Sequence, residues 1–169
     1  MRFGVVPELL EFDRHAILAG EIWRLWTCHL VHYSTRHALI DLATAAAACS
    51  VALPVLGWRR LCLAVALTAP LIAGGLLLLA PDLIYYRGAS GMAVMLVVLA
   101  ACTLWRQAGI RARTALALLG VALAVKIGAE ALGYTTGWSD LPADVHVAWQ
   151  AHLLGVSSAA LTIKILAVR

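Results

Sequence analysis

Two polar residues lie in segments that are otherwise apolar enough to span a bilayer. Ser90, in the run Gly88-Ala89-Ser90-Gly91, opens one such segment, and His152 lies inside another. Polar groups at membrane depth cost free energy, so they usually face an interior cavity and mark function. A hydroxyl and an imidazole also suffice for nucleophilic acyl transfer, in which the imidazole takes the hydroxyl proton. The pair therefore predicts a serine nucleophile, Ser90, with His152 as its general base.

The elements that must position this pair belong to a membrane protein. Of the 169 residues, 63% are hydrophobic and 13% are charged, and the mean hydropathy is +0.89. Soluble domains have about 45–50% apolar and about 25% charged residues. The net charge of +4 does not indicate a nucleic-acid partner, because the basic residues are too scattered to form a basic stripe. The partner that composition indicates is the lipid bilayer.

Five apolar segments approach the roughly 20 residues that a membrane-spanning helix needs. They lie at about residues 34–57, 61–80, 90–105, 114–132 and 145–168. The third is short for a full crossing, so we expect Ser90 to lie inside the membrane rather than at its surface. The connections are short and contain no repeats or linkers. These features predict an all-α membrane protein with one domain over residues 1–169.

The distribution of basic residues between the loops predicts the orientation. The loops on one side carry only basic residues: Arg59, Arg60, Arg106, Arg111, Arg113, Lys164 and Arg169. The other side mixes both signs, including Arg2, Arg14, Arg87, Asp82, Asp140 and Asp144. The first side is therefore expected to be cytoplasmic. This orientation places Ser90, His152 and His37 at similar depth toward the outer side.

The surroundings of Ser90 suit the chemistry of a nucleophile. A helix that begins at Ser90 presents unsatisfied N–H groups and a positive dipole end, which can stabilise an oxyanion. Gly88 and Gly91 allow tight backbone geometry and the close approach of a substrate. The alternative is that Ser90 only caps the helix in a glycine-rich turn.

The segment around His152 favours close contact with another helix. Gly155 and Ala159 are four residues apart, on nearly the same face as His152. Such spacing of small residues lets two membrane helices approach closely. We expect the partner to be the helix that begins at Ser90. The alternative is a neutral, buried histidine that is hydrogen-bonded within the bundle.

Other polar groups invite metal or transport hypotheses. His29, His32 and His37 lie within nine residues, but no Glu, Asp or Cys partner with the spacing of a closed metal site is nearby. We therefore predict no metal and no cofactor, and expect these histidines to act as oxyanion donors or to fix a loop. Lys126 and Glu130 are four residues apart and predict an ion pair within one helix. A transport pathway is the alternative.

The four cysteines, Cys28, Cys49, Cys62 and Cys102, form no CxxC pair. Cysteine in an apolar helix behaves as a small hydrophobic residue. We expect that role here, with redox or ligand chemistry as the alternative.

Taken together, these motifs resemble the rhomboid family of intramembrane serine proteases. The quoted stretches look like the rhombosortase branch of that family: Phe12-Asp13-Arg14-His15-Ala16-Ile17, Gly20-Glu21-Ile22-Trp23-Arg24-Leu25-Trp26-Thr27, Tyr86-Arg87-Gly88-Ala89-Ser90-Gly91 and Trp149-Gln150-Ala151-His152.

The resemblance implies a six-helix bundle with a Ser–His dyad and no third acidic member. Ser90 then corresponds to the nucleophile, His152 to the general base and His37 to an oxyanion-hole histidine. Trp23 and Arg24 correspond to the Trp-Arg pair of the outer loop. The implied substrates are exported proteins with a C-terminal GlyGly-type sorting tail, cleaved in the bacterial inner membrane with the active site toward the periplasm.

Three features depart from the family pattern. Asp41 stands where rhomboids commonly have an oxyanion-stabilising asparagine, and it could donate to an oxyanion only if protonated. Val94 replaces an aromatic residue that often packs on the catalytic histidine, so we expect another residue to orient His152. Only the apolar stretch at residues 4–10 precedes the Trp-Arg loop, so five membrane helices are expected, with the first of the usual six missing or truncated.

The sequence leaves two alternative functions open. One is a non-catalytic rhomboid-like protein that binds transmembrane segments, which the replacement at Asp41 and the short N-terminal region favour. The other is a histidine-rich metal or haem protein of the membrane.

Overall fold

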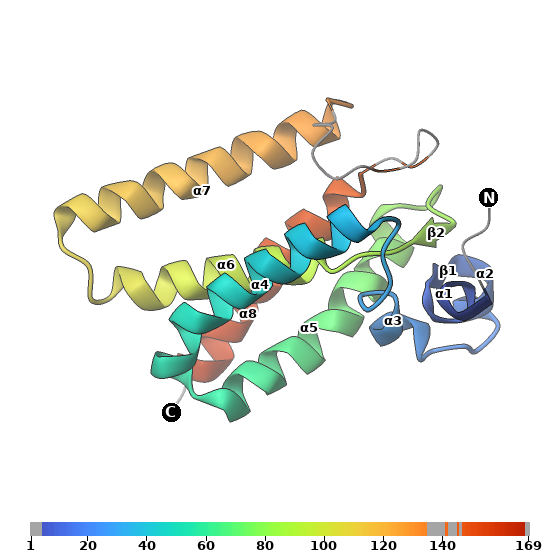
Figure 1. Ribbon diagram of the computed structural model, residues 1–169, viewed down its shortest axis with the longest axis horizontal. Helices are drawn as coiled ribbons and strands as arrows, with labels where there is room; N and C mark the ends of the chain where they lie inside the picture. Colours follow the sequence, from blue (N-terminus) through green and yellow to red (C-terminus); the bar gives the residue numbers. More distant parts are fainter. Residues whose placement is uncertain (1–4, 135–140, 142–144, 146, 168–169) are drawn as a thin grey trace.

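Five long helices form the body of the molecule in the computed structural model, which describes residues 5–134, 141, 145 and 147–167 (Figure 1). They are α4 (Thr35–Leu56), α5 (Trp58–Leu79), α6 (Ser90–Trp105), α7 (Ile110–Ala131) and α8 (Trp149–Ala167). Each overlaps one of the five predicted apolar segments, although α5 and α7 begin before theirs. Helices α4, α5 and α7 are long and apolar enough to cross a membrane, and α6 is a shorter apolar helix. The predicted all-α membrane fold is confirmed.

Two connections are shorter than the sequence predicted. A single residue, Gly57, joins α4 to α5 with φ of +75°, so residues 58–60, which the predicted segments left as a connection, are helical. Similarly, Arg111 and Arg113 lie in the first turn of α7 rather than in a loop. Arginine can extend its charged end to the polar interface while its backbone stays helical, so these residues do not interrupt the helices.

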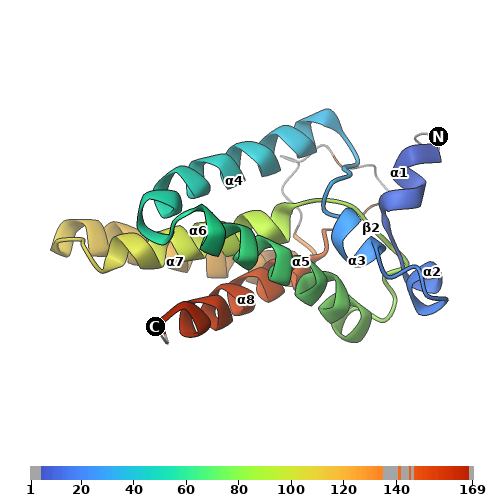
Figure 2. The same cartoon turned by 90° about the horizontal axis from the view of Figure 1, so that it is seen from below.

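A small lobe lies at the end of the bundle where α6 begins (Figures 1 and 2). It contains three short helices, α1 (Val5–Leu10), α2 (Arg14–Leu18) and α3 (Arg24–Thr27). Strand β1 (Phe12–Asp13) in the lobe pairs antiparallel with β2 (Tyr85–Tyr86), which directly precedes the Gly88–Ser90 turn. The sequence did not predict this two-stranded pairing, which ties the lobe to the segment that leads into α6.

Arg14 ties the lobe to the end of α5. Its guanidinium donates to the carbonyl oxygens of Leu76 (3.1 Å), Leu77 (3.0 Å), Ala80 (2.6 Å) and Leu83 (3.0 Å). The last carbonyl groups of a helix have no donor within the helix. The Arg14 side chain therefore supplies hydrogen-bond donors to carbonyl groups at the end of α5 and holds the segment that follows α5 in place.

Two ion pairs, one partly exposed and one buried, complete the attachment of the lobe. Arg24, the arginine of the Trp-Arg pair, donates to the carbonyl oxygens of Glu8 (2.8 Å) and Glu11 (2.9 Å) and to the carboxylate of Glu21 (2.7 Å). The Glu11 carboxylate accepts from Arg87 Nε at 2.6 Å. Because Arg87 directly precedes Gly88, these contacts anchor the turn that carries Ser90.

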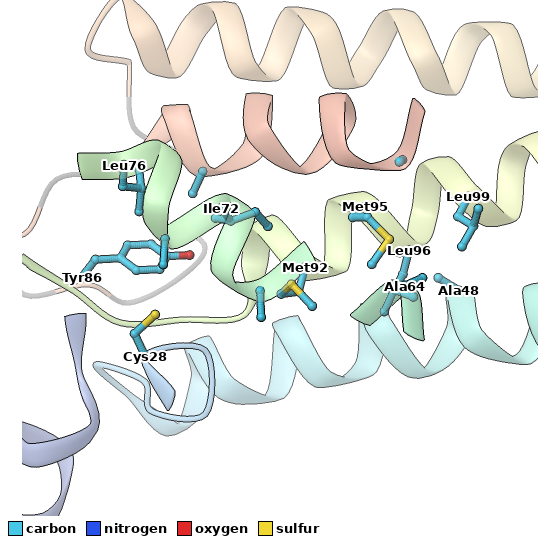
Figure 3. Packing of buried hydrophobic residues seen from close by; sticks show 14 of the residues in the cluster. Cys28, Ala48, Ala64, Ile72, Leu76, Tyr86, Met92, Met95, Leu96 and Leu99 are labelled. Atoms are coloured by element: carbon cyan, nitrogen blue, oxygen red, sulfur yellow. The ribbon is translucent and has the colours of Figure 1, made fainter. Parts of the chain in front are cut away.

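Helix α6 lies at the centre of the core and packs against α4, α5 and α8. Figure 3 shows Met95 and Leu99 of α6 among the buried side chains, with Ile72 and Leu76 of α5 nearby. All four are essentially inaccessible to solvent. The helix that begins at Ser90 is thus the most enclosed element of the fold.

Helices α6 and α8 meet backbone to backbone. A Cβ atom on Gly155 would lie 2.2 Å from the carbonyl oxygen of Gly91, and one on Gly91 would lie 2.7 Å from that of Ala151. No side chain fits at either position. The expectation that the small-residue face of α8 packs on the helix beginning at Ser90 is confirmed.

Helix α7 runs along one side of the other long helices (Figure 1). All of its residues are described, and Glu130 is the one that is buried. The apolar side chains of α7 are therefore largely exposed at the surface of the bundle, where a bilayer would cover them, and its inward contact is charged.

We expect Gly155→Ala to lower the free energy of unfolding by about 1–3 kcal/mol, because the added methyl forces α6 and α8 apart. The measurement is thermal unfolding of the purified protein in detergent, followed by tryptophan fluorescence. The control is Gly74→Ala on α5, where a Cβ meets nothing within 4 Å. Equal unfolding temperatures for the two variants would contradict the backbone contact.

Candidate active site

A cavity of about 730 Å³ lies between α4, α6, α7 and α8. Its lining is mainly apolar, but it includes Ser90, His152, His37, Asp41 and Glu130. The structure thus brings both residues of the predicted dyad and the two predicted supporting side chains to one cavity. Glu130 was not predicted to be there.

The turn before Ser90 is held on both sides. Gly88 has φ of +134°, and its N–H donates to the carbonyl oxygen of Cys28 at 3.1 Å. Its own carbonyl oxygen accepts from the Tyr86 hydroxyl at 3.0 Å and lies 3.2 Å from His29 Nδ1. Ser90 then begins α6 and is half-buried at the cavity wall.

The two groups that hold the Gly88 carbonyl are neutral. Burial raises the pKa of the Tyr86 phenol well above its usual range, so its hydroxyl keeps the proton that it donates. Burial lowers the pKa of His29, whose second nitrogen lies 3.0 Å from the Ala69 carbonyl oxygen. A neutral imidazole has one N–H and donates to one of its two carbonyl neighbours at a time. His29 therefore fixes a loop, one of the two roles expected for this histidine cluster.

Asp41 acts as an acceptor at this turn. Its Oδ2 atom accepts from the Ala89 N–H at 2.9 Å and lies 3.2 Å from His32 Nε2 and 3.4 Å from His37 Nε2. His32 Nε2 also lies 3.3 Å from the Ala89 nitrogen. The contacts of Asp41 thus orient the peptide immediately before Ser90. Donation from a protonated Asp41 to an oxyanion stays a prediction.

His37 has a free nitrogen in a buried position. Its Nδ1 atom has no hydrogen-bond partner within the described part of the chain, and its ring packs parallel to Tyr33 and edge-on to His32. Buried polar atoms are nearly always paired. An unpaired nitrogen on a cavity wall can therefore serve a group that arrives with the substrate.

The two glycines near Ser90 make room for neighbouring parts of the protein. A Cβ on Gly88 would lie 2.9 Å from His37 Cε1, and one on Gly91 would meet Ala151. Their small size is needed, as the sequence predicted. Contacts with α4 and α8 require it, and the close approach of a substrate stays a prediction.

The imidazole of His152 contacts a carboxylate that sequence reasoning missed. His152 Nδ1 lies 2.7 Å from Glu130 Oε2, and both side chains are about 5% exposed. Lys126 donates to the other oxygen of Glu130, so the predicted ion pair within α7 is confirmed. The signal available in the sequence was that Asp41 and Glu130 are the two acids within the five apolar segments.

Within the described residues, no three His, Cys, Asp or Glu side chains are grouped in a way that could hold a metal ion. Cys28 is buried, and burial raises its pKa to about 12, which keeps the thiol protonated. These two observations give no support to metal or redox chemistry at this turn.

We expect Gly88→Ala to destabilise the protein more than Gly20→Ala does. Both glycines have positive φ, so each substitution strains the backbone by about 1–3 kcal/mol. A Cβ at Gly20 meets nothing within 4 Å, whereas one at Gly88 meets His37. Thermal unfolding in detergent measures the difference, and equal losses would show that His37 does not occupy this space.

Comparison with known proteins identifies a family. The family model described as the Rhomboid domain matches residues 19–169. No curated protein and no solved structure matches the chain. The family model covers the Trp-Arg pair, the histidine cluster, Ser90 and His152. The chain therefore belongs to the rhomboid family, a family of multi-pass membrane proteins that are generally intramembrane serine proteases, although some members are inactive.

Proposed function

We propose that this protein is an intramembrane serine endopeptidase with a Ser90–His152 dyad. The observation that carries the proposal is that both residues line one cavity, on two helices that are locked together by the contact between Gly91 and Gly155. Nucleophile and base must be held in fixed relative geometry for acyl transfer. A backbone contact one residue after Ser90 and three residues after His152 provides such a constraint.

The reaction follows from the protonation of His152. A carboxylate only accepts hydrogen bonds, so the contact with Glu130 requires the proton of neutral His152 on Nδ1 and leaves the lone pair on Nε2. Nε2 then removes the proton from Ser90 as Oγ attacks the scissile carbonyl carbon. The imidazolium returns this proton to the leaving amine, and water hydrolyses the acyl-enzyme by the same steps.

Two groups are proposed to stabilise the oxyanion. The Ser90 N–H lies at the first position of α6, where helical N–H groups lack acceptors within the helix. The other is His37, whose buried Nδ1 lacks a partner in the described structure; because its Nε2 faces the Asp41 carboxylate, we propose that the ring donates from Nδ1 as an imidazolium, with a proton on each nitrogen. Donors that are already in place when charge develops lower the barrier most effectively.

We also propose that the substrates are exported proteins with a C-terminal GlyGly-type tail, as in the rhombosortase branch. The motif stretches around Arg14, Arg24, Ser90 and His152 support this branch. The largely apolar wall of the cavity suits a transmembrane segment of a substrate better than a polar peptide.

The proposed location is the bacterial inner membrane, with the active site toward the periplasm. Figure 1 shows that the α4–α5 and α6–α7 connections and the end of α8 lie at the end of the bundle opposite the lobe. The exposed basic residues of these regions are Arg59, Arg60, Arg106, Arg111, Arg113 and Lys164. Basic loops favour the cytoplasmic side, and the Ser90 turn is at the other end. Arg169, Arg2, Asp140 and Asp144 lie outside the described residues.

We expect Ser90→Ala and His152→Ala each to lower the cleavage rate of a GlyGly-tailed reporter by about 10³-fold or more. The assay uses purified protein in detergent or liposomes. Ser157→Ala is the matched control, because Ser157 lies on α8 but is exposed and bonds only to the Leu153 carbonyl oxygen among the described contacts. Wild-type cleavage by Ser90→Ala would overturn the proposal. Failure of a fluorophosphonate to label Ser90 in folded protein would favour the non-catalytic alternative.

We expect cleavage to depend on the glycines of the substrate tail. Replacing the two glycines of the reporter by leucines should reduce kcat/KM by about tenfold or more, because bulky side chains hinder access to a half-buried nucleophile in the wall of a cavity. A tail with the same glycines but a shuffled transmembrane segment serves as the control. Equal cleavage of the glycine and leucine tails would reject the rhombosortase substrate class while leaving the peptidase intact.

A further inference from the structure

The burial of the side chains on α7 does not follow their polarity. Its apolar side chains are largely exposed, while the single buried residue of this fully described helix is the carboxylic acid Glu130. A charged group in a membrane segment is costly unless it is paired. Lys126 on the same helix already supplies a partner, so charge neutralisation alone does not require Glu130 to reach α8.

The contact that Glu130 makes on α8 has a defined chemical effect. Its Oε2 atom lies 2.7 Å from His152 Nδ1, and Lys126 donates to Oε1. Each carboxylate oxygen thus has its own donor, and the Lys126 contact restricts the position that the carboxylate can take. The Nδ1–H tautomer of His152 is favoured, and the ring is held with Nε2 available.

Another residue has to hold the His152 ring, because α6 offers no aromatic side chain one turn after Ser90. Val94, one turn after Ser90, lines the cavity with a branched aliphatic side chain. Such a side chain cannot stack on an imidazole in the way an aromatic ring does. Glu130 comes from α7, on another wall of the same cavity.

We propose that Glu130 is a positioning residue for His152 and completes a Ser90–His152–Glu130 array, with Lys126 holding the carboxylate. This inference rests on the proposed peptidase function. When Ser90 attacks the substrate, its proton moves to His152 Nε2 and the ring becomes an imidazolium. Glu130 stabilises that cation without taking the proton itself, and the proton leaves with the amine product.

Three substitutions separate this role from a purely structural one. Glu130→Gln keeps the shape and removes the charge, whereas Glu130→Asp keeps the charge and shortens the side chain. Lys126→Gln breaks the same ion pair within α7 but leaves the carboxylate beside His152. We expect kcat on the reporter to fall by about 10²- to 10⁴-fold for Glu130→Gln, with KM changed by less than about threefold. Glu130→Asp and Lys126→Gln should each retain at least about tenfold more activity than Glu130→Gln.

A spectroscopic measurement tests the mechanism without relying on turnover. In protein with ¹⁵N-labelled histidine and Ser90→Ala, the His152 resonances should show the Nδ1–H tautomer. Adding Glu130→Gln should increase the Nε2–H tautomer, because the amide can donate to Nδ1. Circular dichroism and thermal unfolding establish that each variant is folded.

The outcomes distinguish the two proposals. If Ser90→Ala and His152→Ala are inactive but folded Glu130→Gln has wild-type kcat, the dyad stands and the role of Glu130 is rejected. If Lys126→Gln loses as much activity as Glu130→Gln but keeps the Nδ1–H tautomer of His152, the ion pair rather than the contact with His152 is what matters, and the role is again rejected. Cleavage by Ser90→Ala overturns the peptidase itself.

Discussion

The candidate site depends first on the contact between the backbones of α6 and α8. Gly155 leaves no space for a side chain because the Gly91 carbonyl oxygen occupies its Cβ position. In a bilayer, helix association gains little from the hydrophobic effect, so close packing supplies much of the attraction. Since Gly91 directly follows Ser90 and Gly155 lies one turn after His152, this packing also constrains the separation of the two residues of the proposed dyad. The same contact therefore constrains both the packing of α6 on α8 and the geometry of the proposed dyad.

Around that contact, ionisable groups are arranged so that Asp41 and Glu130 each have more than one polar neighbour. Asp41 accepts from the Ala89 N–H next to two histidines, and Glu130 accepts from Lys126 and His152. Carboxylates at membrane depth are tolerated under such conditions. The lobe follows the same rule, since Arg14 satisfies the carbonyl end of α5. Polar pairing, rather than additional apolar area, fixes the segment that carries Ser90.

Much of this arrangement was predictable from the sequence. The rest was not predictable, and the reasons are physical. Apolar segment length identifies the five long helices, and the spacing of Gly155 and Ala159 identifies the packing face of α8. The lobe escaped prediction because its short elements are stabilised by distant partners rather than by local periodicity. The contact between Glu130 and His152 joins residues 22 apart on different helices, whereas the i,i+4 pair with Lys126 already accounted for the acid. The local i,i+4 spacing accounts for the ion pair with Lys126 but gives no indication that Glu130 also contacts His152.

The length of α6 has a consequence for the surrounding lipid. At 1.5 Å per residue its 16 residues span about 24 Å, and the 22 residues of α7 span about 33 Å. A hydrocarbon core is about 30 Å thick, so enclosed α6 is too short to cross it, whereas exposed α7 is slightly longer than the core is thick. Lipids can relieve a short helix by thinning and a long one by allowing it to tilt. The depth at which Ser90 lies, and the distance that water must travel to reach it, are therefore properties of the protein and its bilayer together.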